Sequence, residues 1–170
     1  MSGSDFTFVP YRSRAYDYVR FSSGNRELDT WLREHGGQNQ RLNRARTFLL
    51  VRTDPSSREV IGYFSLVNFQ IGPKDAEQIL KRDYRYPMPA TLLTRLAVSR
   101  DRQGEGFGGV LLEQAMRHAL LSLEFSASEM FVVDAADQNA IEFYKRHGLE
   151  LLHEEGRRLI IPTLSIAHLS

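Results

Sequence analysis

The sequence predicts a single α/β domain built around a mixed β-sheet. Its 170 residues match one ordinary domain, and a composition of 42% hydrophobic and 25% charged residues is typical of a folded globular chain. Short apolar runs of strand length alternate along the chain with longer segments of helical periodicity. No internal repeat, low-complexity tract or long linker divides it. We therefore expect one domain over residues 1–170.

The chain opens with a predicted strand and a predicted helix. Residues 6–11 alternate as a half-buried strand does. Asn25 is a favourable N-cap, and apolar residues follow it at spacings of three and four. The adjacent Gly36 and Gly37 are expected to interrupt this helix.

A hairpin is predicted next. The apolar run 47–51 ends at a turn over residues 54–57, and residues 60–69 supply the second strand. A short helix over residues 74–80 precedes an irregular segment over 85–89, because two prolines there remove hydrogen-bond donors.

The second half has a clearer β-α-β-α order. We predict a strand over 92–98, a long helix over 107–123, a strand over 130–133 and a helix over 137–147 that Gly148 closes. The strands are almost continuously apolar, as expected where both faces of a sheet are covered. A hairpin of residues 149–152 and 158–161 completes the sheet.

The composition excludes several classes of protein. There are no cysteines, and the five histidines lie too far apart in sequence to suggest a metal site. No apolar run approaches the roughly 20 residues of a membrane span, and residues 1–10 lack the pattern of a secretion signal. We expect a cytoplasmic protein without metal and without a membrane segment.

Positive charge is concentrated in the first part of the chain. The net charge is +1, but residues 1–52 hold nine arginines against five acidic residues. Arginine binds phosphate oxygens in a bidentate way, so this excess is compatible with a phosphate-bearing partner. At this charge density, a solvated surface is the commoner explanation of such an excess.

A glycine-rich segment joins the predicted strand 92–98 to the long helix. Gly104, Gly106, Gly108 and Gly109 lack Cβ atoms, so the turn can direct several backbone N–H groups to one point at the helix N-terminus. That point favours an anion such as a pyrophosphate. The segment matches neither a P-loop nor a dinucleotide fingerprint, and a tight strand-to-helix turn is the alternative.

The stretch Gln103-Gly104-Glu105-Gly106-Phe107-Gly108 resembles the signature with which GNAT acetyltransferases bind the pyrophosphate of coenzyme A. The resemblance implies acetyl-CoA as cofactor and the GNAT fold, a mostly antiparallel central sheet with one splayed strand, flanked by helices. The splayed strand would pair its backbone with the pantetheine arm. The implied cofactor residues here are Leu96, Ala97, Val98, Gln103, Gly104, Glu105, Gly106, Phe107, Gly108 and Gly109.

A second segment, residues 137–149, is similar to the GNAT pattern Asn-x-x-Ala-x-x-Phe-Tyr-x-x-x-Gly-Phe. The resemblance makes Tyr144 the general acid that protonates the departing thiolate, and adds Asp137, Asn139 and Phe143 to the cofactor site. Asp137 and Leu149 depart from the pattern, so Asn139 could supply the contact that Asp137 lacks. Helical spacing alone favours Tyr144 as a core aromatic residue, and His147 is either a base or a cap on the helix end.

The N-terminal half resembles one GNAT branch, the bacterial toxins that acetylate aminoacyl-tRNA. The similar segments are residues 21–33, 39–40, 45–48, 62–66 and 95–98. This resemblance implies an aminoacyl-tRNA acceptor, a cognate antitoxin as partner and a homodimer. Four arginines are candidates for contact with the tRNA: Arg41, Arg44, Arg46 and Arg95.

Two other functions fit the same residues. One is a GNAT enzyme that acetylates a small amine, a polyamine or a protein N-terminus. The other is a non-catalytic module that binds acyl-CoA.

Overall fold

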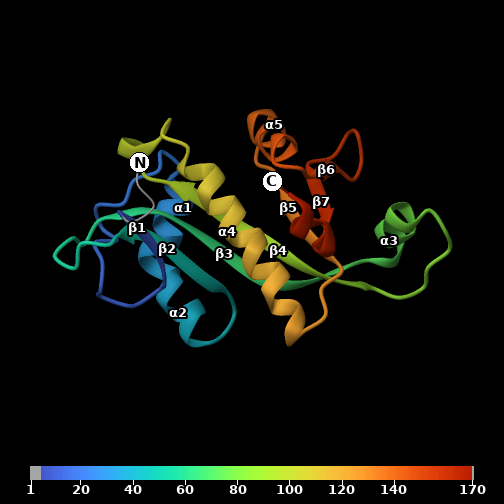
Figure 1. The fold of residues 1–170 in the computed structure, drawn as a ribbon, viewed down its shortest axis with the longest axis horizontal. Coiled ribbons are helices and arrows are strands. Elements are labelled where there is room, and N and C mark those ends of the chain that lie inside the picture. The colour runs from blue at the N-terminus through green and yellow to red at the C-terminus, as the bar shows by residue number, and fades with distance from the viewer. Residues whose placement is uncertain (1–4, 170) are drawn as a thin grey trace. The chain divides into compact units, whose positions relative to one another are not determined.

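The computed structural model describes residues 5–169, which form a mixed α/β fold (Figure 1). Seven strands form one sheet in the order β1-β2-β3-β4-β5-β7-β6. They are β1 (Phe6–Pro10), β2 (Arg46–Arg52), β3 (Val60–Ile71), β4 (Met88–Val98), β5 (Met130–Asp134), β6 (Glu150–Leu151) and β7 (Arg158–Pro162). The α-helices are α1 (Arg26–Thr30), α2 (Gly36–Arg41), α3 (Pro73–Leu80), α4 (Phe107–Leu121) and α5 (Gln138–Arg146). This is the mostly antiparallel, helix-flanked sheet that the sequence predicts.

The chain divides into two compact units. The first contains Met1–Leu66 and Arg95–Glu113, and the second contains Val67–Thr94 and Gln114–Ser170. Strands β3 and β4 and helix α4 each contribute residues to both units.

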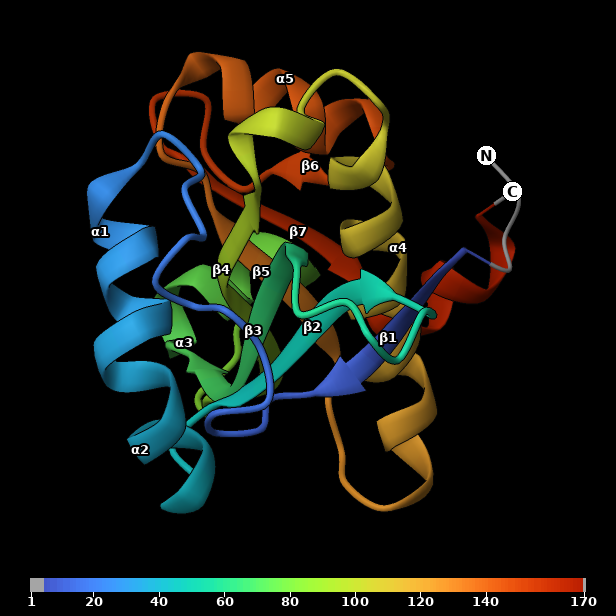
Figure 2. The same cartoon turned by 90° about the vertical axis from the view of Figure 1, so that its left-hand side faces the viewer.

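In the first unit, β1, β2 and the first part of β3 pair in antiparallel order. Phe8 of β1 faces Leu50 of β2, and Phe48 of β2 faces Phe64 of β3. The two strands β1 and β2 lie side by side in Figure 2. A bulge at Leu50/Val51 shifts the register of the β2–β3 ladder. The predicted strand and hairpin are therefore confirmed.

The helix that follows β1 does not end at the two glycines, contrary to the prediction. It passes from α1 through a π-helical turn, η1 (Trp31–His35), into α2, which begins at Gly36. A Cβ on Gly36 would lie 3.1 Å from Cε2 of Tyr11. The glycine is used for close packing against an aromatic ring, and both its φ and ψ are helical. Tertiary packing therefore keeps this segment helical, although the local helix propensity of two glycines is low.

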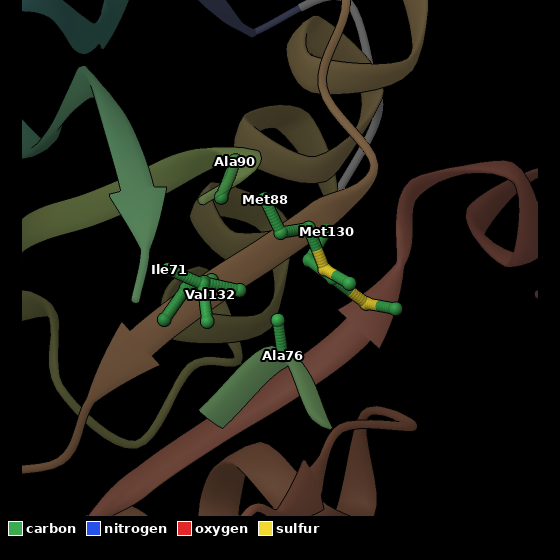
Figure 3. Close-up of a cluster of buried hydrophobic side chains, with 6 residues drawn as sticks. All are labelled: Ile71, Ala76, Met88, Ala90, Met130 and Val132. Carbon is green, nitrogen blue, oxygen red and sulfur yellow. The ribbon is translucent and has the colours of Figure 1, made fainter. Parts of the chain in front are cut away.

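In the second unit, β4 and β5 pair in parallel, with Leu92 opposite Val132. Six buried residues from β3, α3, β4 and β5 form a core cluster here, shown in Figure 3: Ile71, Ala76, Met88, Ala90, Met130 and Val132. Strand β4 begins at Met88, so Pro89 belongs to a strand and not to the irregular segment that we predicted. The Pro89 carbonyl accepts a hydrogen bond from the Glu129 N–H. Proline can make this bond because it acts only as the acceptor and needs no N–H.

The rest of the second unit follows the predicted order. Helix α5 is capped by Asp137, and β6 and β7 form the final antiparallel hairpin. Helix α4 ends at Leu121 and continues as a short 3-10 turn, η3 (Ser122–Glu124). A second 3-10 segment, η4 (Thr163–His168), was not predicted. Among residues 5–169, no helix has the length and apolarity to cross a membrane.

Candidate active site

The glycine-rich segment lies between β4 and α4 in the first unit. Gly104 and Gly106 have φ angles of +84° and +87°, a left-handed backbone that favours glycine. A Cβ at either position would meet no atom within 4 Å, so the backbone of this turn borders open space. The Val110 N–H makes the first helical hydrogen bond, to the Gly106 carbonyl at 3.3 Å. The preceding amides at the start of α4 are therefore available to an anion such as a pyrophosphate.

Three contacts hold this turn in place. The Gln103 amide Nε2 donates to the carbonyls of Val98 at 3.0 Å and of Ser23 at 2.7 Å. The Arg102 guanidinium binds Glu59 with two bonds of 3.0 and 3.1 Å. The Gln103 side chain therefore stabilises the turn, a role that we did not predict from the sequence motif.

Residues 22–24 also support the turn, which we did not predict from the sequence. The Arg100 N–H donates to the Ser22 carbonyl at 2.7 Å. Gly24 has a φ of +94°, and a Cβ there would lie 3.0 Å from Nη2 of Arg100. The sequence gives little indication of this contact, because residues 22–24 lie about 80 positions before the turn.

The end of β4 comes close to β3 at Gly62. A Cβ on Gly62 would lie 2.7 Å from the Ala97 carbonyl oxygen and 2.8 Å from Cδ1 of Leu111. The glycine therefore allows this approach, which no other residue would permit without a shift. The ladder between β4 and β5 covers only Ala90–Leu93, although β4 continues to Val98.

Phe107 contributes its backbone to the turn and its side chain to the core. The ring is 2% exposed and packs edge-on against Phe6, with 5.0 Å between the ring centroids. Glu105 is exposed. Of the side chains in the turn, that of Phe107 is committed to packing.

Tyr144 lies on α5 in the second unit and is buried. Desolvation raises the pKa of Tyr144 to about 12, so its phenol is protonated at neutral pH. The hydroxyls of Tyr18 and Tyr63 donate to the carbonyls of Arg12 and Leu28. Within residues 5–169, the Tyr144 hydroxyl has no such partner, and the one fully buried side-chain oxygen without a partner is that of Thr163. The Tyr144 oxygen therefore reaches accessible surface, where a ligand can meet it.

The other residues of the second motif shape the helix around Tyr144. The Asp137 carboxylate accepts the Ala140 N–H at 2.8 Å and caps α5, whereas Asn139 is exposed. Phe143 packs edge-on against Tyr144, with 5.1 Å between centroids. Nδ1 of His147 donates to the Phe143 carbonyl at 2.9 Å, so this ring caps the helix end, which is one of the two roles that we expected for it.

The four candidate tRNA-binding arginines lie in the first unit. Arg41 and Arg44 are exposed near the end of α2, and Arg46 binds the Asn43 side chain at the start of β2. Arg95 is half-buried, with its guanidinium carbon 4.1 Å from the ring centroid of Trp31, a cation–π contact. Burial lowers the pKa of Arg95. Trp31 and Arg41 are ten residues apart, roughly 15 Å along a helix, so the four do not form one cluster.

Within residues 5–169, no group of three His, Asp or Glu side chains could hold a metal ion. The described residues offer a glycine-rich turn that borders open space in one unit and a protonated phenol in the other. These are the parts that acyl transfer from a phosphorylated thioester carrier requires of a protein that supplies no nucleophile.

The model of the acetyltransferase (GNAT) family matches residues 12–149, most of the chain. A tRNA-acetylating toxin of Mycobacterium tuberculosis is 31% identical over 139 residues, which cover 82% of this chain and 81% of the relative.

Solved structures of the toxin AtaT are similar over nearly the whole chain. One holds AtaT in complex with acetyl-methionyl-tRNAfMet, with a TM-score of 0.85, 27% identity and coverage of 96% of this chain and 98% of AtaT. Another holds a tyrosine-to-phenylalanine mutant of AtaT with the C-terminus of the antitoxin AtaR and acetyl-CoA. Its TM-score is 0.78, at 28% identity and coverage of 96% and 97%.

Proposed function

We propose, from the premise that this chain belongs to the GNAT family of acetyltransferases, that it is a toxin which acetylates the α-amine of aminoacyl-tRNA with acetyl-CoA and so blocks translation. The observation that carries the choice of acceptor is the 31% identity to a tRNA-acetylating toxin over most of both chains. The likeness to AtaT, solved with acetylated methionyl-tRNA, supports the same acceptor.

The residues around the glycine-rich turn fit the diphosphate of coenzyme A. The open space beside Gly104 and Gly106 leaves their backbone accessible, and the helix start at Phe107 provides N–H donors. Gly108 and Gly109 add further amides, while Gln103 and Arg102 keep the turn in shape. Leu96, Ala97 and Val98 would offer backbone groups to the pantetheine arm. Acetyl-CoA supplies an acetyl thioester when bound.

Tyr144 holds the proton that the leaving sulfur needs. The attacking amine forms a C–N bond to the acetyl carbon, the C–S bond breaks, and the phenolic proton passes to sulfur. The nitrogen then releases its extra proton to solvent, and solvent restores the proton on the phenol. Because burial raises the pKa of Tyr144 to about 12, the residue carries this proton at every physiological pH.

The acceptor amine requires little help from a base. An α-amino group has an unperturbed pKa of roughly 7.7 to 8.0, so a large fraction of it is neutral near pH 7.5. His147 is committed to the end of α5, so we assign it no role as a base.

The proposed function also assigns partners and a compartment. A toxin that acts on aminoacyl-tRNA works in the cytoplasm, where its substrate is made. AtaT is solved with the C-terminus of the antitoxin AtaR, and we propose a cognate antitoxin for this chain as well. A homodimer stays a prediction from the family resemblance.

Mass spectrometry of aminoacyl-tRNA incubated with the protein and acetyl-CoA tests this function. We expect a gain of one acetyl group on the α-amine of one or a few aminoacyl-tRNAs. A parallel reaction with free amino acids and polyamines as acceptors is the control. Acetylation of the small amines with no change in any aminoacyl-tRNA would reject the toxin function and leave a small-molecule acetyltransferase. Acetyl-CoA binding with no product from either acceptor class would leave a non-catalytic module.

A further inference from the structure

The first unit contains a cavity of about 750 Å³ that none of the glycine-turn residues lines. Its walls come from the loop after β1, from the helix of η1 and α2, and from the turn between β2 and β3. Four arginines and two stacked tyrosines define what we call the arginine cavity: Tyr11, Arg14, Tyr18, Arg33, Arg41 and Arg58. Of these, Arg41 is one of the arginines that the sequence indicates as candidates for contact with the tRNA, and Arg33 lies near it in the chain.

Close packing shapes one wall of the cavity. The rings of Tyr11 and Tyr18 stack with 4.7 Å between centroids and an interplanar angle of 13°, and both are 8% exposed. A Cβ on Gly37 would lie 3.1 Å from Oγ of Ser13, so the helix meets the loop without a gap. The helix also contains the π-turn η1, an irregularity that is rare and concentrated at functional sites.

The loop that carries Arg14 is held in an unusual conformation. Arg14 has a φ of +64°, a left-handed backbone that arginine seldom adopts. The Arg58 guanidinium donates to the Arg14 carbonyl at 2.8 Å and links the loop to the β2–β3 turn. Such conformations persist where the surrounding structure enforces them, and they cluster at ligand-binding sites.

The charge of the cavity is positive. Its lining holds four arginines and two acidic residues, Asp17 and Glu34, a balance of +2. Asp17 pairs with Arg20 at 3.4 Å, and Glu34 pairs with Arg33 at 3.5 Å. Within residues 5–169, neither Arg14 nor Arg41 forms an ion pair. The surplus guanidinium groups therefore face the cavity without a protein counter-charge.

We infer that the arginine cavity binds backbone phosphates of the RNA that carries the acceptor amine. This inference rests on the proposed function, because an aminoacyl-tRNA extends far beyond its reacting end. Planar guanidinium groups bind phosphate oxygens through two parallel hydrogen bonds, and the stacked rings of Tyr11 and Tyr18 form a packed wall beside them. The volume is sufficient for one or two nucleotides.

The lining favours RNA over an acidic peptide. Peptide docking relies on apolar pockets for anchor side chains. The aliphatic side chain in this lining is Val19, which is 75% exposed and forms no such pocket. Guanidinium groups, hydroxyls and amides make up most of the remaining lining, as at interfaces with a nucleic-acid backbone.

The test measures binding of uncharged tRNA at several salt concentrations. The variant Arg14→Gln/Arg41→Gln removes two cavity charges, and Arg85→Gln/Arg117→Gln removes two exposed charges outside the lining. We expect the cavity variant to raise the Kd about tenfold at low salt and to lower the slope of log Kd against log salt by about two. The control variant should stay close to the wild type. Thermal melting checks that all three proteins are folded.

The other outcomes show whether the inference or the proposed function fails. Equal affinity and equal slope for the cavity variant and the wild type would overturn the inference, as would a wild type that binds no tRNA. If the wild type binds a labelled polyglutamate peptide and the cavity variant does not, while both bind tRNA equally well, the cavity belongs to an acidic protein partner and the inference is overturned. If aminoacyl-tRNA is acetylated with an unchanged KM by the cavity variant, this inference fails while the proposed function stands. If the wild type binds tRNA through the cavity but acetylates none, the proposed function fails instead.

Discussion

At the scale of single residues, Tyr144 differs from the other buried tyrosines in what its hydroxyl contacts. Tyr18 and Tyr63 give their protons to backbone carbonyls, so these hydroxyls serve the fold. The Tyr144 ring is equally buried against Phe143, but its hydroxyl has no acceptor within the described chain. The ring therefore belongs to the core, while the hydroxyl remains available for the catalytic role that we propose for it.

The variant Tyr144→Phe should lower kcat by about 10²-fold to 10⁴-fold, the usual contribution of a positioned general acid. The KM for acetyl-CoA should change little, because the phenol acts on the leaving sulfur and not on the diphosphate. Steady-state kinetics with aminoacyl-tRNA measure both parameters. Tyr86→Phe, at a 70% exposed position, is the matched control. An unaltered kcat would remove Tyr144 from the mechanism.

At the scale of elements, two glycine-bearing segments show two uses of the same residue. In the turn before α4, Gly104 and Gly106 take left-handed backbone angles beside open space. In the helix after β1, Gly36 and Gly37 have helical surroundings and give room to the Tyr11 ring and the Ser13 hydroxyl. The first use leaves space beside the backbone, where we propose that a ligand binds, and the second serves packing.

Acetyl-CoA should raise the melting temperature of the wild type, since a ligand that binds only the folded state adds about 2.7 kcal/mol at 100 times its Kd. Gly106→Trp should abolish this shift, because a large side chain fills the space beside the turn. Gly106→Ala shares the strain of a positive φ but adds little bulk, so it should keep part of the shift. Differential scanning fluorimetry measures all three. A full shift in Gly106→Trp would contradict the assignment of the turn to the diphosphate.

Gly36→Val should destabilise the protein by about 1–3 kcal/mol, the usual cost of an overpacked site. The added methyl groups would press on Tyr11 and Trp31, whose rings lie 3.1 and 3.6 Å from the position of a Cβ. Urea unfolding followed by circular dichroism gives the free energy. Gln38→Val introduces the same β-branched residue at an exposed position of α2 and is the control. Equal stability of the two variants would show that the helix does not depend on this contact.

At the scale of the whole molecule, the buried tyrosines make stability depend on alkaline pH. Burial raises the pKa of Tyr144 to about 12 and also raises the pKa values of Tyr11, Tyr18 and Tyr63. In the unfolded chain these phenols lose their protons near pH 10. The folded state holds the protons more tightly, so this stabilisation is complete below pH 10 and is lost as the pH rises through 10 toward 12 and above.

We therefore expect the free energy of unfolding to be level from pH 7 to 9 and to fall above pH 10, by an amount on the order of a few kcal/mol. Denaturant titrations at each pH measure it. Tyr144→Phe should reduce the slope above pH 10, whereas the exposed Tyr86→Phe should not. A stability that is independent of pH between 10 and 12 would contradict the burial of these phenols.

The sequence by itself determined the order of strands and helices, the positions of the glycines in the turn before α4 and the helix that carries Tyr144. These are local properties, since hydrophobic periodicity, caps and left-handed glycines act over a few residues. Only the tertiary structure decided that the helix continues through Gly36 and that Gln103 binds Ser23, 80 positions away in the chain. It also decided that arginines from three separate segments line one cavity. The physical reason is the same in each case, because the contact that fixes the outcome lies between groups that are distant in sequence, and no local preference encodes it.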